Sequence, residues 1–193
     1  MSLLELIAAA DERGLAAGAA ACLERCLPQP APGDEPDPLR PLWAGCADPR
    51  LWPARLAEAR AALDSVAGPL ADPGEPVGRV RDLLAGAPDD RAGEALRVWA
   101  DACSVLALEL HLGHDATGPA AADRVARCRA GDLSGAGPLL AGEVARQVRI
   151  LEMLAGIDDA APAGAGLRQV LDVSTEGQRV LRAAAARRAR VRR

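Results

Sequence analysis

Apolar residues recur at intervals of three and four along most of this 193-residue chain, which is the spacing of one face of an α-helix. The clearest of these stripes is Leu96, Trp99, Cys103, Leu106 and Leu110. Runs of alternating β-branched residues, which would indicate strands, are hard to find, and Phe and Tyr are absent. The sequence therefore predicts an all-α fold.

The apolar residues of this chain are mostly small. Half of all residues are hydrophobic, but many of these are Ala, which is the best helix former and buries little area. Helices with Ala-rich faces can approach closely, and the chain is long enough for one compact core. We expect a single domain over residues 1–193, a helical bundle of six or seven helices that are mostly antiparallel.

Start and stop signals place these helices along the chain. Ser2 and Glu5 form a capping-box pattern, so the first helix begins at once and reaches about residue 26, with Gly14 and Gly18 positioned to bend or split it. Asp48 precedes Pro49 as a helix cap does. The remaining helices are expected near residues 49–66, 77–84, 90–112, 119–129, 138–154 and 167–186.

A proline-rich, acidic segment over residues 28–49 interrupts the helical pattern. We expect it to be a long surface loop, because its prolines oppose both a packed helix and a sheet ladder. Trp43 and Trp52 bracket this proline-rich loop and are expected to pin it to the helices. If they are exposed instead, they are the first candidates for a partner surface.

The charge pattern excludes several classes of protein. All 23 cationic side chains are Arg, which a GC-rich bacterial genome explains through codon usage, and the net charge is −4. No apolar run approaches the roughly 20 residues that a membrane span needs. The acidic start, with Glu5, Asp11 and Glu12, does not resemble a signal peptide. We expect a cytoplasmic protein with no membrane contact, whose five Cys are buried thiols.

The only two histidines lie in the stretch ELHLGHD, residues 109–115. Gly113 after a helical run is typical of a left-handed residue just past a helix end, and His near that end is favoured by the helix dipole. A metal site is the alternative, since imidazole and thiolate are good zinc ligands. Its candidate ligands are Cys103, Glu109, His111 and His114. Cys103, His111 and roughly His114 share one helical face, but Glu109 is not on it, so a fourth tetrahedral ligand of known position is missing and no cofactor is predicted.

The C-terminal end, residues 186–193, is the most strongly charged part of the chain. From Gly177 onward there are seven Arg and no carboxylate. Such a tail can neutralise phosphates, pair with another acidic partner, or pair with the acidic loop 33–37 of this chain. Its candidate binding residues are Arg187, Arg188, Arg190, Arg192 and Arg193.

Few residues suited to acid, base or nucleophilic chemistry lie together in the sequence, so an enzyme is not favoured. The leading hypothesis is a binding protein, an adaptor or regulator with a protein partner, which also forms a homodimer through an Ala-rich helix face. One alternative is a metal-dependent enzyme or sensor centred on His111 and His114. The other is an accessory protein that docks on nucleic acid through the Arg-rich tail.

Overall fold

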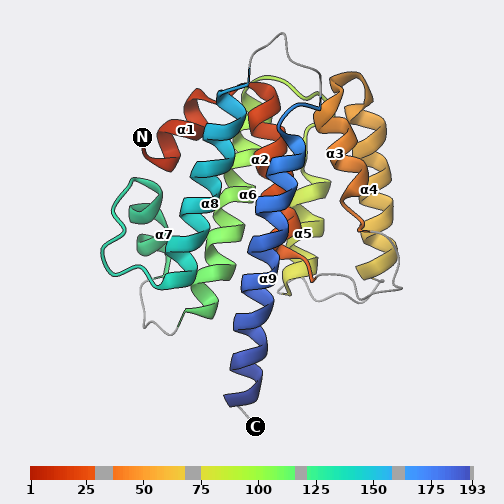
Figure 1. Cartoon of the computed structure of the whole chain (residues 1–193). Coiled ribbons are helices and arrows are strands. Elements are labelled where there is room, and N and C mark those ends of the chain that lie inside the picture. The colour runs from red at the N-terminus through yellow and green to blue at the C-terminus, as the bar shows by residue number, and fades with distance from the viewer. Residues whose placement is uncertain (29–36, 68–74, 116–120, 158–163, 192–193) are drawn as a thin grey trace.

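The structure is a computed structural model that describes residues 1–28, 37–67, 75–115, 121–157 and 164–191 (Figure 1). These residues form α-helices and one short 3-10 helix and contain no strand, which confirms the all-α prediction. The predicted number of six or seven helices is wrong, because the described ranges contain nine. The helices are α1 (Leu3–Ala9), α2 (Glu12–Cys26), α3 (Arg40–Ala47), α4 (Trp52–Ala67), α5 (Pro76–Ala85), α6 (Gly93–His114), α7 (Ala121–Arg129), α8 (Pro138–Ala155) and α9 (Leu167–Val191).

One of the additional helices arises because the first predicted helix is two helices. The Ser2 capping box is present as expected. The chain then leaves the helical conformation at Ala10, and the Asp11 side chain accepts a hydrogen bond from the Gly14 amide to start α2. The break therefore lies at an N-capping aspartate, and α2 continues through Gly14 and Gly18, where we expected a bend or a split.

The other additional helix lies in the segment predicted to be a loop. Residues 40–47 of the 28–49 segment form α3, with Pro41 in the first turn, where its missing N–H costs nothing. Residues 29–36 lie outside the described residues. Asp48 accepts from the Arg50 amide and starts a 3-10 turn, Pro49–Leu51, that leads into α4.

Four helices run side by side through the middle of the molecule, with α3 and α4 on one side and α1 and α7 on the other (Figure 1). Helices α2, α6, α8 and α9 all contact one another. α2 is the most deeply buried of them, and the following alanines have almost no exposed surface: Ala16, Ala17, Ala19, Ala20 and Ala21. This Ala-rich face of α2 is thus packed inside the chain.

A tryptophan pair joins α4 to α6. The rings of Trp52 and Trp99 meet edge to face, with centroids 5.8 Å apart, an arrangement that aromatic rings prefer. The Trp52 indole is fully buried and donates a hydrogen bond of 2.8 Å to the Pro88 carbonyl. Trp43, on α3, is 7% exposed. Both tryptophans of the predicted partner surface therefore pack inside the molecule.

No helix within the described ranges is both long and apolar enough to cross a bilayer. The inward face of α9 is apolar only where the helix runs along the body of the molecule. The C-terminal turns of α9 extend past the ends of the neighbouring helices (Figure 1).

Candidate functional site

Helix α6 does not end where the sequence suggested. Gly113 is helical and exposed, and α6 continues through it to His114. The helix ends at Asp115, which has an extended backbone and donates its amide to the carbonyls of His111 and Leu112. The role predicted for Gly113 as the residue past the helix end is therefore wrong.

Asp115 connects the end of α6 to the start of α8. Its carboxylate accepts hydrogen bonds from the Leu139 and Leu140 amides, at 3.0 and 2.9 Å. These are two of the amides that a helix start leaves without partners, and a negative charge is favoured there. A β-carbon on Gly137 would lie 2.2 Å from the Asp115 carboxyl carbon, so only glycine fits there. The last residue of ELHLGHD thus has a structural role.

His111 is fully buried and faces a carboxylate on another helix. Its Nδ1 lies 2.7 Å from the Ala107 carbonyl oxygen, and its Nε2 lies 3.5 Å from Oε2 of Glu143 on α8. Burial lowers the pKa of His111 below its ordinary value, and the nearby Glu143 only partly opposes this. The neutral imidazole is therefore the form that this position favours at neutral pH.

Glu143 is itself the centre of a buried ion pair between α8 and α2. Arg25 donates to it from Nε at 3.0 Å and from Nη2 at 2.7 Å, and both side chains have no exposed surface. Gln147 donates to the same carboxylate at 2.9 Å. Nη1 of Arg146 lies 3.6 Å from Oε2 of Glu143. A bidentate guanidinium with further donors is the arrangement that a buried carboxylate requires.

Each charge of this pair favours the ionised form of the other. Burial raises the pKa of Glu143, but the Arg25 guanidinium, His111 and the hydrogen bonds lower it more, and the net result is a pKa below the usual value. Burial likewise lowers the pKa of Arg25, and Glu143 raises it more. Both groups are therefore ionised at neutral pH, and removal of either leaves the other as an uncompensated buried charge.

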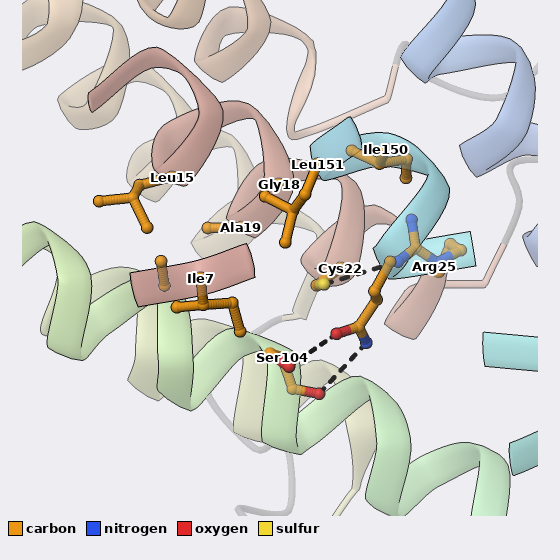
Figure 2. A pocket seen from close by; sticks show the side chains of 11 residues that line it. Ile7, Leu15, Gly18, Ala19, Cys22, Arg25, Ser104, Ile150 and Leu151 are labelled. Atoms are coloured by element: carbon orange, nitrogen blue, oxygen red, sulfur yellow. Dashed lines mark hydrogen bonds between the residues drawn. The ribbon is translucent and has the colours of Figure 1, made fainter. Parts of the chain in front are cut away.

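A small cavity lies beside this ion pair, between α1, α2, α6 and α8 (Figure 2). Its walls are apolar toward Ile7, Leu15 and Leu151 and polar toward Ser104 and Arg25, and Ser104 donates to Gln147 at 2.6 Å. Its volume of about 20 Å³ is enough for one water molecule and too small for a ligand.

His114 lies apart from His111, in different surroundings. Its Nδ1 is 2.8 Å from the Leu110 carbonyl, and its side chain lines a surface groove of about 450 Å³. The groove is bordered by the C-terminal ends of α2 and α6, the start of α5 and residues 178–185 of α9. The two histidines therefore do not share a pocket.

The remaining candidate metal ligands also point to different surroundings. Glu109 forms an ion pair with Arg79 on α5. Cys103 is fully buried, and burial raises the pKa of its thiol well above the ordinary value. Among the residues that the structure describes, no group of three or more His, Cys, Asp or Glu side chains is placed to hold a metal ion. All five thiols are buried and free.

The Arg-rich tail is helical through Val191, where the sequence suggested that the helix dissolves. Arg187 and Arg190 are exposed. Arg188 turns back to the body and donates to the Gly113 carbonyl. Arg192 and Arg193, and residues 33–36 of the acidic loop, lie outside the described residues, so the predicted pairing of tail and loop does too.

Sequence reasoning missed the most densely bonded polar group of the molecule, formed by Arg25, Glu143 and Gln147. A signal for it existed: Glu143 and Gln147 flank Val144 on the inward stripe of α8, and Arg25 stands between the inward Cys22 and Cys26. Charged residues on an inward face indicate a buried pair. Which of these buried polar residues contact each other depends on how the helices that carry them pack.

The comparisons with known proteins give no further guidance. No family model matches the chain, and neither the curated proteins nor the solved structures contain a match.

Proposed function

We propose that this protein is a helical-bundle binding protein, an adaptor or regulator without enzymatic activity, that holds an acidic segment of a partner protein on the C-terminal half of α9. The observation that supports this proposal is the one-sided charge of that half-helix. From Gly177 to the end of the chain there are seven Arg and no carboxylate. Such a surface attracts acidic partners over distances of about one Debye length.

The arginines of α9 are arranged on its outward face. With 3.6 residues per turn, Arg179, Arg182, Arg187 and Arg190 fall within an arc of about 140°, and all four are exposed. Arg188 points the other way, to the Gly113 carbonyl. The N-terminal half of the outward face carries Asp172 and Glu176, so the purely basic surface begins at Arg179.

A protein partner suits this surface better than a nucleic acid does. The five Arg of the last seven residues leave a net charge of −9 on the rest of the chain, which repels an extended phosphate backbone. The sequence has no Phe or Tyr for stacking on bases. A short acidic peptide needs only the half-helix and does not have to approach the acidic body.

The metal-dependent alternative has less support, because His111 and His114 lie in separate surroundings. A homodimer through α2 also has little support, because its alanines are buried within the chain. The groups suited to chemistry are engaged elsewhere: Glu143 with Arg25, Glu109 with Arg79, and Asp115 with the start of α8.

The proposal is tested by fluorescence anisotropy with a labelled oligoglutamate peptide at low and at physiological salt. We expect saturable binding that weakens with salt. The double variant Arg187→Ala/Arg190→Ala should bind about tenfold more weakly, since each exposed ion pair contributes up to about 1 kcal/mol.

The matched control is Arg149→Ala/Arg168→Ala, which removes the same charge from exposed positions on α8 and at the start of α9. It should retain the affinity of the unchanged protein. Equal loss in both double variants would mean that only net charge matters and would overturn the proposal. Tighter binding of a single-stranded oligonucleotide than of the peptide, abolished in Arg187→Ala/Arg190→Ala, would assign the surface to nucleic acid instead.

A further inference from the structure

We propose that the groove between α2, α5, α6 and α9 binds a small amphipathic carboxylate, a molecule with one acidic head and an apolar tail. This inference does not depend on the protein partner proposed above, because the groove lies beside the basic face of α9 and has its own lining.

The groove has the size and walls of a small-molecule site. Its volume is about 450 Å³, and ligand pockets typically measure about 300–1,000 Å³. Most of the residues that line the groove are apolar. The lining as a whole comes from α5, α6, α9 and the end of α2. The apolar residues that line it are Cys26, Leu27, Pro28, Pro76, Val77, Leu181 and Ala185.

The polar residues of the lining favour an anion. Arg25, Arg182 and His114 line the groove together with the neutral Gln178, and Glu75 is the one carboxylate among the lining residues. Glu75 is exposed and makes no side-chain hydrogen bond to the helix that it precedes. The two guanidinium groups of the lining therefore outnumber its one carboxylate.

Two groups at the groove still have hydrogen-bonding capacity. Arg25 uses Nε and Nη2 for Glu143, and its third nitrogen, Nη1, is buried without a hydrogen-bond partner in the described ranges. A buried unpaired donor is costly, and a carboxylate would satisfy it. His114 donates to the Leu110 carbonyl through Nδ1, so its Nε2 can donate to a ligand carboxylate only when the imidazole carries both protons.

The start of α5 supplies a third favourable element. α5 has ten residues and begins with Pro76, and Val77 in its first turn lines the groove. The first amides of a helix lack partners within the helix, and no side chain caps this end in the described residues. Together with Arg25, this helix start places positive potential at the groove.

The occupant that fits both features is a medium-chain monocarboxylate. Its single charge matches the few donors, and its tail covers the apolar lining residues that are not fully buried, which are Pro28, Pro76, Val77, Leu181 and Ala185. A purely polar anion would leave the apolar lining in contact with water. An alkane-like molecule would leave Nη1 of Arg25 without a hydrogen-bond partner.

The experiment uses the full chain and isothermal titration calorimetry with octanoate. Octanol, which has the same tail without the charge, and acetate, which has the charge without the tail, are the ligand controls. We expect octanoate to saturate one site and both controls to bind at least about tenfold more weakly. Equal binding of octanoate and octanol would overturn the carboxylate assignment.

The variant that blocks the groove is Ala185→Trp, because Ala185 lines it and is only half-buried on α9. The matched control is Ala183→Trp, which places the same side chain on an exposed position of the same helix outside the groove. Octanoate binding should be lost in the first variant and kept in the second, with unchanged far-UV circular dichroism in both. Loss in neither variant, or no octanoate binding at all, would overturn the proposal.

The two proposals fail independently. Ala185→Trp should still bind the oligoglutamate peptide, and Arg187→Ala/Arg190→Ala should still bind octanoate. If octanoate affinity falls with the peptide affinity in the Arg double variant, octanoate binds the basic face and the groove is not its site.

Discussion

Glu24 should make the folded protein less stable as pH rises from about 5 to about 8. This side chain on α2 is 6% exposed, and its Oε2 has no hydrogen-bond partner within the described residues. Burial raises the pKa of Glu24 from 4.5 to about 7, with a further contribution from Asp37 and a partial opposing effect of Ser174. The folded chain therefore keeps a proton that the unfolded chain releases.

The sign and the size of the effect follow from this difference. Below pH 4.5 both states are protonated and the full stability is present, and it is lost as pH rises through about 7. A shift from 4.5 to about 7 corresponds to about 3 kcal/mol. The variant Glu24→Gln keeps the neutral shape and should gain up to about 3 kcal/mol over the unchanged protein at pH 8, with little gain at pH 5.

The assay is urea unfolding at several pH values, with the free energy of unfolding compared between the variant and the unchanged protein at each pH. Glu176→Gln, at an exposed position on α9, is the control, and its difference should not change with pH. A flat difference for Glu24→Gln, or a loss of stability at pH 8, would refute the argument that burial keeps this carboxyl protonated.

Three further substitutions test the packing of the site by the free energy of unfolding. Glu143→Ala leaves the buried Arg25 guanidinium unpaired and should cost about 3–5 kcal/mol; a cost below about 1 kcal/mol would mean that the pair is not buried in solution. Gly177→Ala places a β-carbon 2.4 Å from Cδ of Arg25 and should cost about 1–3 kcal/mol in thermal unfolding; an unchanged midpoint would contradict the close approach of α9. Asp115→Ala removes the acceptor for the first amides of α8 and should cost about 0.5–2 kcal/mol, with faster amide hydrogen exchange in the first turn of α8 as the specific sign.

The parts of the fold that the sequence predicted are those controlled by local chemistry. The Ser2 capping box, the start of α8 at Gly137 and Pro138, and the end of α5 before Gly86 appear as expected. Each depends on residues within one turn of each other, so the sequence pattern alone specifies it.

The errors have a common physical cause, which is that one residue type fits more than one local structure. Gly113 after a helical run predicts a helix end, but glycine is also tolerated inside a helix whose neighbours are well packed. The prolines of residues 28–49 predict a loop, but one of them, Pro41, is equally suited to the first turn of α3. Asp11 separates α1 from α2 as an N-cap, a signal that the glycines nearby obscured.

The candidate site was beyond sequence reasoning for a different reason. Arg25 and Glu143 are 118 positions apart, and only the packing of α2 against α8 brings them together. Of the predicted metal ligands, Cys103, His111 and roughly His114 share a face in the sequence pattern, but in the structure His111 meets Glu143 and His114 lines a separate groove. Contacts between helices depend on packing, which periodicity within one helix does not specify.

The central claim is that the outward face of the C-terminal half of α9 is the binding surface. It is tested most directly by nuclear magnetic resonance of uniformly ¹⁵N-labelled protein titrated with the unlabelled oligoglutamate peptide. The account predicts that the largest amide shifts lie between Arg179 and Arg190, with the exposed face of α4 unchanged. Shifts that spread over the whole surface, or that centre on another helix, would contradict it.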